Sequence, residues 1–184
     1  MERLEAQVTI VQSDITIIEA DAIVNSANKT LLGGGGVDGA IHYAAGPELL
    51  EECRALGGCK TGEAKATKAY NLPATHVIHT VGPFFGFENG REPELLASCY
   101  ANSLALADTL RATSIAFPCI STSAFQYPKD QAAKVAVASV NEYLKANPQS
   151  VIETVLFVVR DELDYNLYHA LLQGQEIDLS KFSQ

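Results

Sequence analysis

Apolar residues recur along this chain with two different periods, and each period predicts one type of secondary structure. Over residues 3–12 apolar and polar positions alternate, which is the pattern of an amphipathic strand. The run at 151–159 is strongly β-prone and mostly apolar, which favours a strand in the interior of a sheet. Further strands are predicted at 21–25, 63–70, 76–81 and 114–119.

Helices are predicted between these strands. The clearest spans 47–56, with Pro47 near its first position and Gly57 just beyond its end. Asn147 ends another, because the proline that follows it cannot continue a helix. Helices are predicted over 38–45, 47–56, 93–111, 128–147 and 161–173. Because strands and helices alternate, we expect an α/β fold in which helices cover both faces of a sheet.

The length of 184 residues is that of one domain. We expect a single domain over 1–184, with its core at about 3–173 and a tail at 174–184, and we expect a monomer. The first residues contain no apolar leader, and no stretch approaches the ~20 apolar residues of a membrane span. The expected setting is therefore the cytoplasm, without a membrane partner.

The most informative segment follows the strand predicted at 21–25. Asn25 and Asn28 precede four consecutive glycines, Gly33 to Gly36, and Asp38 comes directly after them in the next predicted helix. Glycines let a ligand approach the backbone closely, and free N–H groups at a helix N-terminus attract anions. The amides and the carboxylate supply polar groups for chemistry. The segment therefore predicts a phosphate-binding loop beside a small reaction site.

Two common nucleotide-binding motifs do not account for this loop. Residues 34–39 formally fit GxGxxG, but the eight residues 25–32 separate the strand from the glycines, whereas the dinucleotide fingerprint needs the strand to run directly into them. Its acidic residue is also missing from the next strand, because Glu51 and Glu52 fall in a helix. No Gly-Lys-Ser/Thr follows, as a P-loop would require. A nicotinamide-dependent oxidoreductase is therefore disfavoured, and no cofactor is expected.

Charge and cysteine spacing argue against two further classes of protein, those that bind nucleic acids and those that bind metal ions. The net charge is −9 and Lys and Arg form no cluster, so we expect no nucleic-acid partner. The phosphates of a small anionic ligand must then be held mostly by neutral donors and helix ends. The four cysteines show no CxxC spacing and the histidines no paired pattern, so no metal site is expected.

These residues closely resemble the motifs of the macrodomains, in particular of the MacroD-type branch. The similarity runs from about Gln12 to Gln173 and includes further motifs in the same order, at 61–65, 72–74, 79–83 and 117–122. The resemblance implies a three-layer α/β/α sandwich with a central mixed sheet that binds ADP-ribose. It also implies removal of mono-ADP-ribose from acidic side chains and deacetylation of O-acetyl-ADP-ribose. The implied partners are ADP-ribose, its esters and mono-ADP-ribosylated proteins.

The resemblance also assigns roles to single residues. It places Asp14 at the adenine amino group, with Ile15 and Arg160 beside the adenine, and Asn28 at the hydroxyls of the distal ribose. Asp38 would lie beside the anomeric carbon, so Asp38 and Asn28 are the expected catalytic residues. The ligand would be wrapped by two loops, one formed by Gly33, Gly34, Gly35, Gly36 and Val37, the other by Ser121, Thr122, Ser123, Ala124, Phe125 and Gln126.

The bond to be cut fits this set of residues. A C1″ ester of a carboxylic acid is labile, so it needs a positioned water more than a strong nucleophile. Asp38 would orient or deprotonate that water or orient the ribose, and a substrate phosphate oxygen is an alternative aid. His42 and His79 are interpreted as buried, hydrogen-bonded histidines, although His42, at i+4, is within reach of Asp38. Asn25 is interpreted as pinning the loop, and Ser121 as a hydroxyl that donates to phosphate.

The second loop departs from the family pattern, which usually reads Ser-Thr-Gly-x-aromatic-Gly-aromatic-Pro. Ser123 and Gln126 replace both glycines, while Phe125 keeps the aromatic. If either position requires φ > 0, its side chain costs roughly 1–2 kcal/mol. Tyr43 also differs from close bacterial relatives, which often have Arg or His there. Two functions stay open: an ADP-ribosyl ester hydrolase, which the first loop favours, and an ADP-ribose reader without useful catalysis, which the altered second loop favours.

Overall fold

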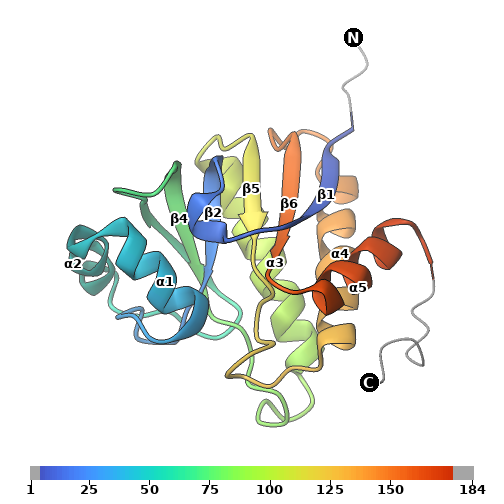
Figure 1. Ribbon diagram of the computed structural model, residues 1–184, viewed down its shortest axis with the longest axis horizontal. Coiled ribbons are helices and arrows are strands. Elements are labelled where there is room, and N and C mark those ends of the chain that lie inside the picture. Colours follow the sequence, from blue (N-terminus) through green and yellow to red (C-terminus); the bar gives the residue numbers. More distant parts are fainter. Residues whose placement is uncertain (1–4, 176–184) are drawn as a thin grey trace.

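The computed structural model describes residues 5–175 and contains a six-stranded sheet (Figure 1). Its strands are β1 (Gln7–Gln12), β2 (Ala20–Ser26), β3 (Ala64–Lys68), β4 (Ala74–Thr80), β5 (Ser114–Phe117) and β6 (Thr154–Val159). They lie in the order β1-β6-β5-β2-β4-β3. Every pair of neighbours is parallel except β3 with β4, which is antiparallel, so the sheet is mixed, as predicted.

Five helices and one short 3-10 turn connect these strands. They are η1 (Ile15–Ile17), α1 (Gly36–Ala45), α2 (Pro47–Leu56), α3 (Glu92–Thr109), α4 (Lys129–Ala146) and α5 (Glu162–Leu172). Each predicted strand and helix is present; the helix predicted over 47–56 has the predicted ends, and the others differ by a few residues. The first helix begins at Gly36 instead of Asp38, because the last glycine of the run already forms its first turn. Within residues 5–175 no helix is long and apolar enough to cross a membrane.

Three further boundaries differ from the predictions. The strand predicted over 114–119 ends at Phe117, before Pro118, whose ring removes a backbone donor. The strand predicted over 151–159 begins at Thr154, since the residues before it lead in from α4. The strand predicted over 3–12 begins at Gln7. The first residues of that prediction and most of the tail predicted over 174–184 lie outside the described residues.

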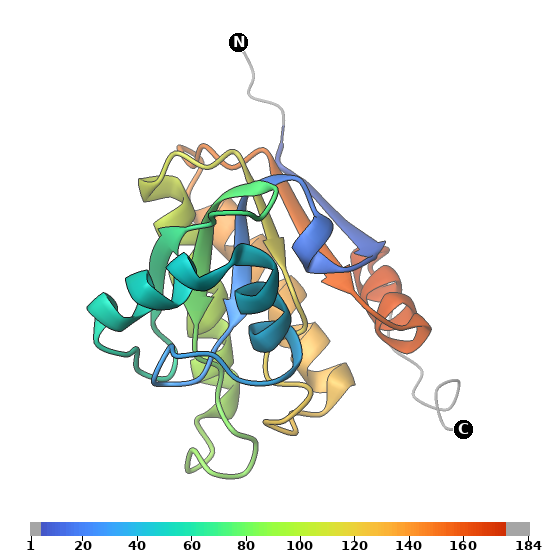
Figure 2. The same ribbon diagram turned by 60° about the vertical axis from the view of Figure 1, so that its left-hand side comes forward.

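Neighbouring residues of the central strands point to opposite faces of the sheet, as strand geometry requires. Ala22 and Val24 of β2 belong to the core formed with α3, α4 and α5, whereas Ile23 belongs to the core formed with α1 and α2. Phe117 and Ala116 of β5 divide in the same way. Helices therefore cover both faces, which confirms the predicted three-layer α/β/α sandwich (Figure 2).

The topology gathers the connecting loops at one edge of the sheet. Strands β1, β6, β5, β2 and β4 run parallel, so their carboxyl ends meet at the lower edge of the view in Figure 1. The segments after β1, β2, β4 and β5 all begin there. In α/β proteins this edge is where ligands bind.

Candidate functional site

Two loops at the carboxyl edge face each other across a cavity, one after β2 and the other after β5. Residues of both predicted ligand loops thus meet, although they lie far apart in the sequence. The prediction did not include Ser26, Ala27 and Cys119, because small residues carry no chemical signal. The cavity is lined by Ser26, Ala27, Asn28, Gly34, Gly35, Val37, Asp38, Cys119, Ser121, Ser123, Ala124 and Phe125.

The glycines of the first loop do different things. Gly33 (φ +88°) and Gly36 (φ +58°) adopt the left-handed conformation that favours glycine. Gly34 has ordinary backbone angles, but a Cβ there would lie 3.1 Å from Asp38 Oδ2 and 3.3 Å from Asn28 Nδ2. At Gly39, in α1, a Cβ would lie 2.4 Å from the carbonyl oxygen of Gly34. Glycine therefore keeps space beside the carboxylate and lets the loop pack directly on α1.

Asn28 holds the first loop in shape. Its Nδ2 donates to the carbonyl oxygen of Gly33 (2.9 Å), and its Oδ1 accepts from the backbone N–H (3.2 Å) and the hydroxyl (2.6 Å) of Thr30. An amide nitrogen carries a second hydrogen, which remains for a ligand in the cavity that Asn28 lines. The loop-pinning role predicted for Asn25 thus belongs to Asn28.

Asp38 is buried in the first turn of α1, with 5% of its surface exposed. Its Oδ1 accepts a hydrogen bond from Asn25 Nδ2 (2.8 Å) and lies 3.5 Å from His42 Nε2. Its Oδ2 is the oxygen nearest to Gly34. Burial raises the pKa of this carboxyl, and the Asn25 hydrogen bond acts in the opposite direction. One oxygen is therefore held from behind while the other faces the glycine loop.

Asn25 and His79 lie behind Asp38, fully buried. They are direct neighbours on the parallel strands β2 and β4, and Asn25 Nδ2 lies 3.2 Å from His79 Nδ1. His79 Nε2 lies 2.9 Å from Thr67 Oγ1. Burial lowers the pKa of His79 to about 3, so the ring is neutral at neutral pH. His79 is the hydrogen-bonded core histidine that was predicted, but its contact with Asn25 required knowledge of strand pairing.

The second loop contains two residues other than glycine in the left-handed conformation, Ser121 (φ +67°) and Gln126 (φ +58°). The position of Gln126 thus favours glycine, as the family pattern implies, whereas Ser123 is not among the positive-φ residues of the described chain. The Ser121 hydroxyl is buried and packs so closely on Gly82 that a Cβ there would lie 2.0 Å from its oxygen. Ser121 also lines the cavity, and donation from its hydroxyl to a phosphate stays a prediction.

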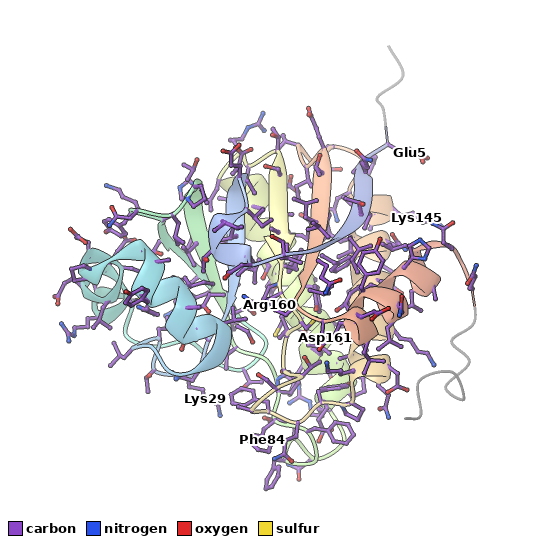
Figure 3. The ribbon with its side chains drawn as sticks, in the orientation of Figure 1. Glu5, Lys29, Phe84, Lys145, Arg160 and Asp161 are labelled. Carbon is purple, nitrogen blue, oxygen red and sulfur yellow. The ribbon has the colours of Figure 1, made fainter. Side chains whose placement is uncertain are left out.

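Aromatic residues of the segment after β4 brace the second loop. The backbone N–H of Phe85 donates to the carbonyl oxygen of Phe125 (2.9 Å), and the rings of Phe84 and Phe125 are 5.4 Å apart. Phe85 and Tyr127 also pack, with ring centroids 5.0 Å apart. Phe84 lies at the lower end of the view in Figure 3, at the same edge as the cavity. We did not predict this support, because no spacing in the sequence links the two segments.

Asp14 and Arg160 meet at the ends of the paired strands β1 and β6 (Figure 3 labels Arg160). Asp14 Oδ1 accepts from the backbone N–H (2.9 Å) and hydroxyl (2.7 Å) of Thr16, and its Oδ2 lies 2.9 Å from Arg160 Nη1. The Thr16 hydrogen bonds, and then Arg160, hold the pKa of Asp14 below its usual value. Ile15 is buried next to them. Of the three residues predicted at the adenine, Asp14 and Arg160 are therefore in contact, and Ile15 follows Asp14 in the chain.

Neither metal nor thiol chemistry is evident in the described part of the chain. No group of three or more His, Cys, Asp or Glu side chains is placed to hold a metal ion in residues 5–175. Cys119 lines the cavity, but burial raises the pKa of its thiol to about 12. A thiol with so high a pKa is a poor nucleophile at neutral pH. The titratable group that the cavity offers for chemistry is therefore Asp38.

An α/β/α sandwich with a glycine loop, a helix N-terminus and a buried carboxylate at one cavity defines a binding domain for a small phosphorylated ligand. The Macro domain family model matches residues 24–136, and the chain belongs to this family. It is 56% identical to the Macro domain-containing protein CT2219 of Chlorobaculum tepidum over 162 residues, which cover 88% of this chain and 93% of that protein.

Two other relatives carry more specific names. The chain is 51% identical over 166 residues to the ADP-ribose glycohydrolase MACROD2 of Mus musculus, covering 90% of this chain and 35% of that protein, so it spans about a third of that relative's length. It also superposes on the Oceanobacillus iheyensis macrodomain solved with ADP, with a TM-score of 0.85 and 42% identity over 90% of this chain and 89% of the other.

Proposed function

We propose that this macrodomain hydrolyses esters in which C1″ of ADP-ribose is bonded to a carboxylic acid. The observation that carries the proposal is the orientation of Asp38: it is buried at the cavity, Asn25 holds one oxygen, and the other faces the glycine loop. The names of the MACROD relatives and the ADP-bound neighbour support the same ligand and reaction.

The ligand would lie along the carboxyl edge of the sheet. Asp14 would accept from the adenine amino group, and backbone N–H groups of the glycine loop and the α1 N-terminus would hold the diphosphate. The distal ribose would lie between Asn28 and Phe125, which line the cavity on opposite loops. This placement brings C1″ to Asp38.

Asp38 would then act on a water molecule. With a pKa raised by burial, its carboxylate is a stronger base than an exposed one and accepts a proton from the water as the water oxygen attacks. The water oxygen bonds to C1″ and the bond between C1″ and the ester oxygen breaks. The products are ADP-ribose and a free carboxylate, and Asp38 then releases the proton to solvent. An ester with a good leaving group needs this positioning more than a covalent intermediate.

The substrates we propose are proteins carrying mono-ADP-ribose on Asp or Glu, and O-acetyl-ADP-ribose. Both present the same C1″-type ester to Asp38. We further propose that the protein acts as a monomer in the cytoplasm. The proposed substrates follow from the resemblance, whereas the monomer and the cytoplasm are expectations carried over from the sequence. Size-exclusion chromatography and fractionation of cells would test these last two.

Single-turnover release of ADP-ribose from a glutamate-linked modified protein tests the reaction. Wild type is expected to release ADP-ribose, whereas Asp38→Ala is expected to lose about a hundredfold or more in rate, as general-base removal does. Calorimetry on both proteins should show that each still binds ADP-ribose. Release by Asp38→Ala at the wild-type rate would remove Asp38 from the chemistry, and absence of binding by wild type would refute the site.

A reader function is the second candidate, and one observation favours it. The second loop holds Gln126 in a conformation that favours glycine, at a position where the family pattern has glycine. Tight ADP-ribose binding by wild type without any release would establish a reader. Restoration of release by Gln126→Gly would then identify this loop as the cause.

A further inference from the structure

Behind the cavity, a line of buried side chains connects the edge strand β3 to Asp38. Thr67 on β3 contacts His79 on β4, with 2.9 Å between Oγ1 and Nε2. His79 Nδ1 lies 3.2 Å from Asn25 Nδ2 on β2, and the same nitrogen lies 2.8 Å from Asp38 Oδ1. All four residues are buried, with 5% or less of their surface exposed. Thr67 and His79 do not line the cavity, so they reach a ligand only through Asn25 and Asp38.

The direction of each hydrogen bond follows from the carboxylate at the end of the line. A carboxylate only accepts, so the group of Asn25 that faces Asp38 is the NH₂. Its second hydrogen points to His79 Nδ1, which must therefore carry no hydrogen. A neutral imidazole without a hydrogen on Nδ1 carries it on Nε2, and Nε2 donates to Thr67 Oγ1. The Thr67 hydroxyl thus supplies the acceptor that this tautomer of His79 needs.

We propose that Thr67 and His79 are positioning residues that lock the Asn25 amide with its NH₂ toward Asp38 and so keep Asp38 ionised, with Oδ2 directed at the ligand. The catalytic part of this inference rests on the proposed hydrolase function. Without the Thr67 hydroxyl, the buried Nε2–H of His79 keeps only the weak acceptor Cys53 Sγ, so the tautomer with the hydrogen on Nδ1 becomes more favourable. Asn25 then turns its oxygen toward both neighbours, and an amide oxygen beside Asp38 favours the protonated acid.

Two neighbours favour the ionised form of Asp38 against the effect of burial, first the Asn25 amide and then His42. On its own helix Asp38 faces His42, whose Nε2 is 3.5 Å from Oδ1. From α2 it faces Cys53, whose thiol has a pKa raised to about 11 by burial and by the Asp38 and Glu52 charges and is therefore neutral. Cys53 Sγ also lies 3.7 Å from His79 Nε2, where sulfur is a weaker acceptor than the Thr67 hydroxyl. In residues 5–175, the ion pairs of the structure give Asp38 no Lys or Arg partner.

The matched pair Thr67→Val and Thr67→Ser tests the proposal, because valine keeps the shape without the hydroxyl and serine keeps the hydroxyl. Long-range ¹H–¹⁵N spectra report the His79 tautomer, and ¹³C spectra across pH report the titration of the Asp38 carboxyl. Single-turnover hydrolysis across pH and ADP-ribose calorimetry complete the set. Each measurement uses the full chain.

Thr67→Ser is expected to match wild type. Thr67→Val is expected to lose the Nε2–H tautomer of His79 and to raise the pKa of Asp38 by about one unit. On the acid side of the pH–rate profile this shift leaves roughly tenfold less carboxylate, so hydrolysis there is expected to be about tenfold slower. Its ADP-ribose affinity should not change. If Thr67→Val does not fold, His79→Asn and His79→Leu replace it, because asparagine retains an acceptor near Nδ1 and leucine does not.

The outcomes separate the positioning line from the proposed function. An unchanged Asp38 titration in Thr67→Val, with or without the tautomer change, overturns the proposal. Equal losses of rate and melting temperature in both Thr67 variants, without a shift of the Asp38 titration, show a structural role only and also overturn it. If wild type hydrolyses no ester but the Asp38 titration shifts in Thr67→Val, the positioning line stands and the hydrolase function fails.

Discussion

The glycines of the cavity wall differ in what an added methyl group would meet. At Gly34 a Cβ would lie 3.1 Å from Asp38 Oδ2, and at Gly39 it would lie 2.4 Å from the carbonyl oxygen of Gly34. At Gly35 it would meet nothing within 4 Å. A side-chain oxygen can move and a packed backbone cannot. The three positions therefore separate effects on function from effects on stability.

Gly34→Ala is expected to slow ester hydrolysis by about tenfold or more, because small displacements of a catalytic group are costly, and to change the unfolding free energy by less than about 0.5 kcal/mol. Gly39→Ala is expected to destabilise the fold by about 1–3 kcal/mol through overpacking. Gly35→Ala is the control for the unfolding measurement only, because Gly35 lines the ligand cavity. Single-turnover rates and urea unfolding measure the two effects, and a Gly34→Ala protein with the wild-type rate would contradict the assigned role of Asp38 Oδ2.

The conformation of Gln126 also leads to a stability prediction. A residue other than glycine with φ +58° costs roughly 1–2 kcal/mol, and the larger unfolded-state entropy of glycine offsets roughly 0.5–1 kcal/mol of that. Gln126→Gly is therefore expected to stabilise the protein by up to about 1 kcal/mol in urea unfolding. Ser123→Gly, at a position without positive φ, should not stabilise it. If Ser123→Gly stabilised the protein and Gln126→Gly did not, the backbone strain would lie at Ser123.

At the scale of elements, one carboxylate fixes the start of β2 against the start of β5. Asp21 Oδ2 accepts from the backbone N–H (2.7 Å) and hydroxyl (2.9 Å) of Thr113 and from the backbone N–H of Ser114 (3.3 Å). The Ser114 hydroxyl accepts in return from the backbone N–H of Asp21 (2.8 Å). The two strands carry the two ligand loops at their other ends, so this pairing sets the distance across the cavity.

Asp21→Ala is expected to destabilise the protein by about 1–2 kcal/mol, since hydrogen bonds to a charged group contribute about 1.5–3 kcal/mol and this group is partly exposed. The Thr113 hydrogen bonds lower the pKa of Asp21, so its contribution is complete above the unfolded pKa near 3.9 and is lost as pH falls through the folded pKa. Urea unfolding from neutral to acid pH measures both. Glu19→Ala, an exposed acid nearby, is the control, and an equal loss in that variant would contradict the assignment.

At the scale of the whole molecule, an acidic protein is proposed to bind an anion. The net charge is −9, and no Lys or Arg is among the residues that line the cavity. Backbone N–H groups and a helix N-terminus act at short range and are little affected by salt. The long-range repulsion, in contrast, is screened, with a Debye length of about 30 Å at 0.01 M and about 10 Å at 0.1 M salt.

The affinity for ADP-ribose is therefore expected to stay constant or to rise by less than about threefold when salt is raised from about 0.01 to 0.1 M. Calorimetry at several salt concentrations measures it, with Arg160→Gln as a companion because Arg160 is the cation predicted at the adenine end. A severalfold loss of affinity with salt in wild type, absent in Arg160→Gln, would show that a cation dominates binding.

The strands, helices and layer order could be predicted from the sequence, because buried faces impose a period of two or of 3.6 on the apolar residues. The glycine loop was also visible, since a run such as Gly33 to Gly36 has few uses other than close approach of a ligand. Boundaries were less accurate. The start of α1 at Gly36, for example, depends on backbone angles that the amino-acid composition does not fix.

By itself the sequence determined the α/β architecture and brought Asp38 and the glycines into one segment, because neighbours in the chain stay neighbours in space. Only the tertiary structure decided which buried groups meet: Asn25 with His79 through strand pairing, and the Ser121 hydroxyl with Gly82 through loop packing. Such contacts join residues far apart in the chain. Their geometry depends on register and packing, which no local pattern of residues encodes.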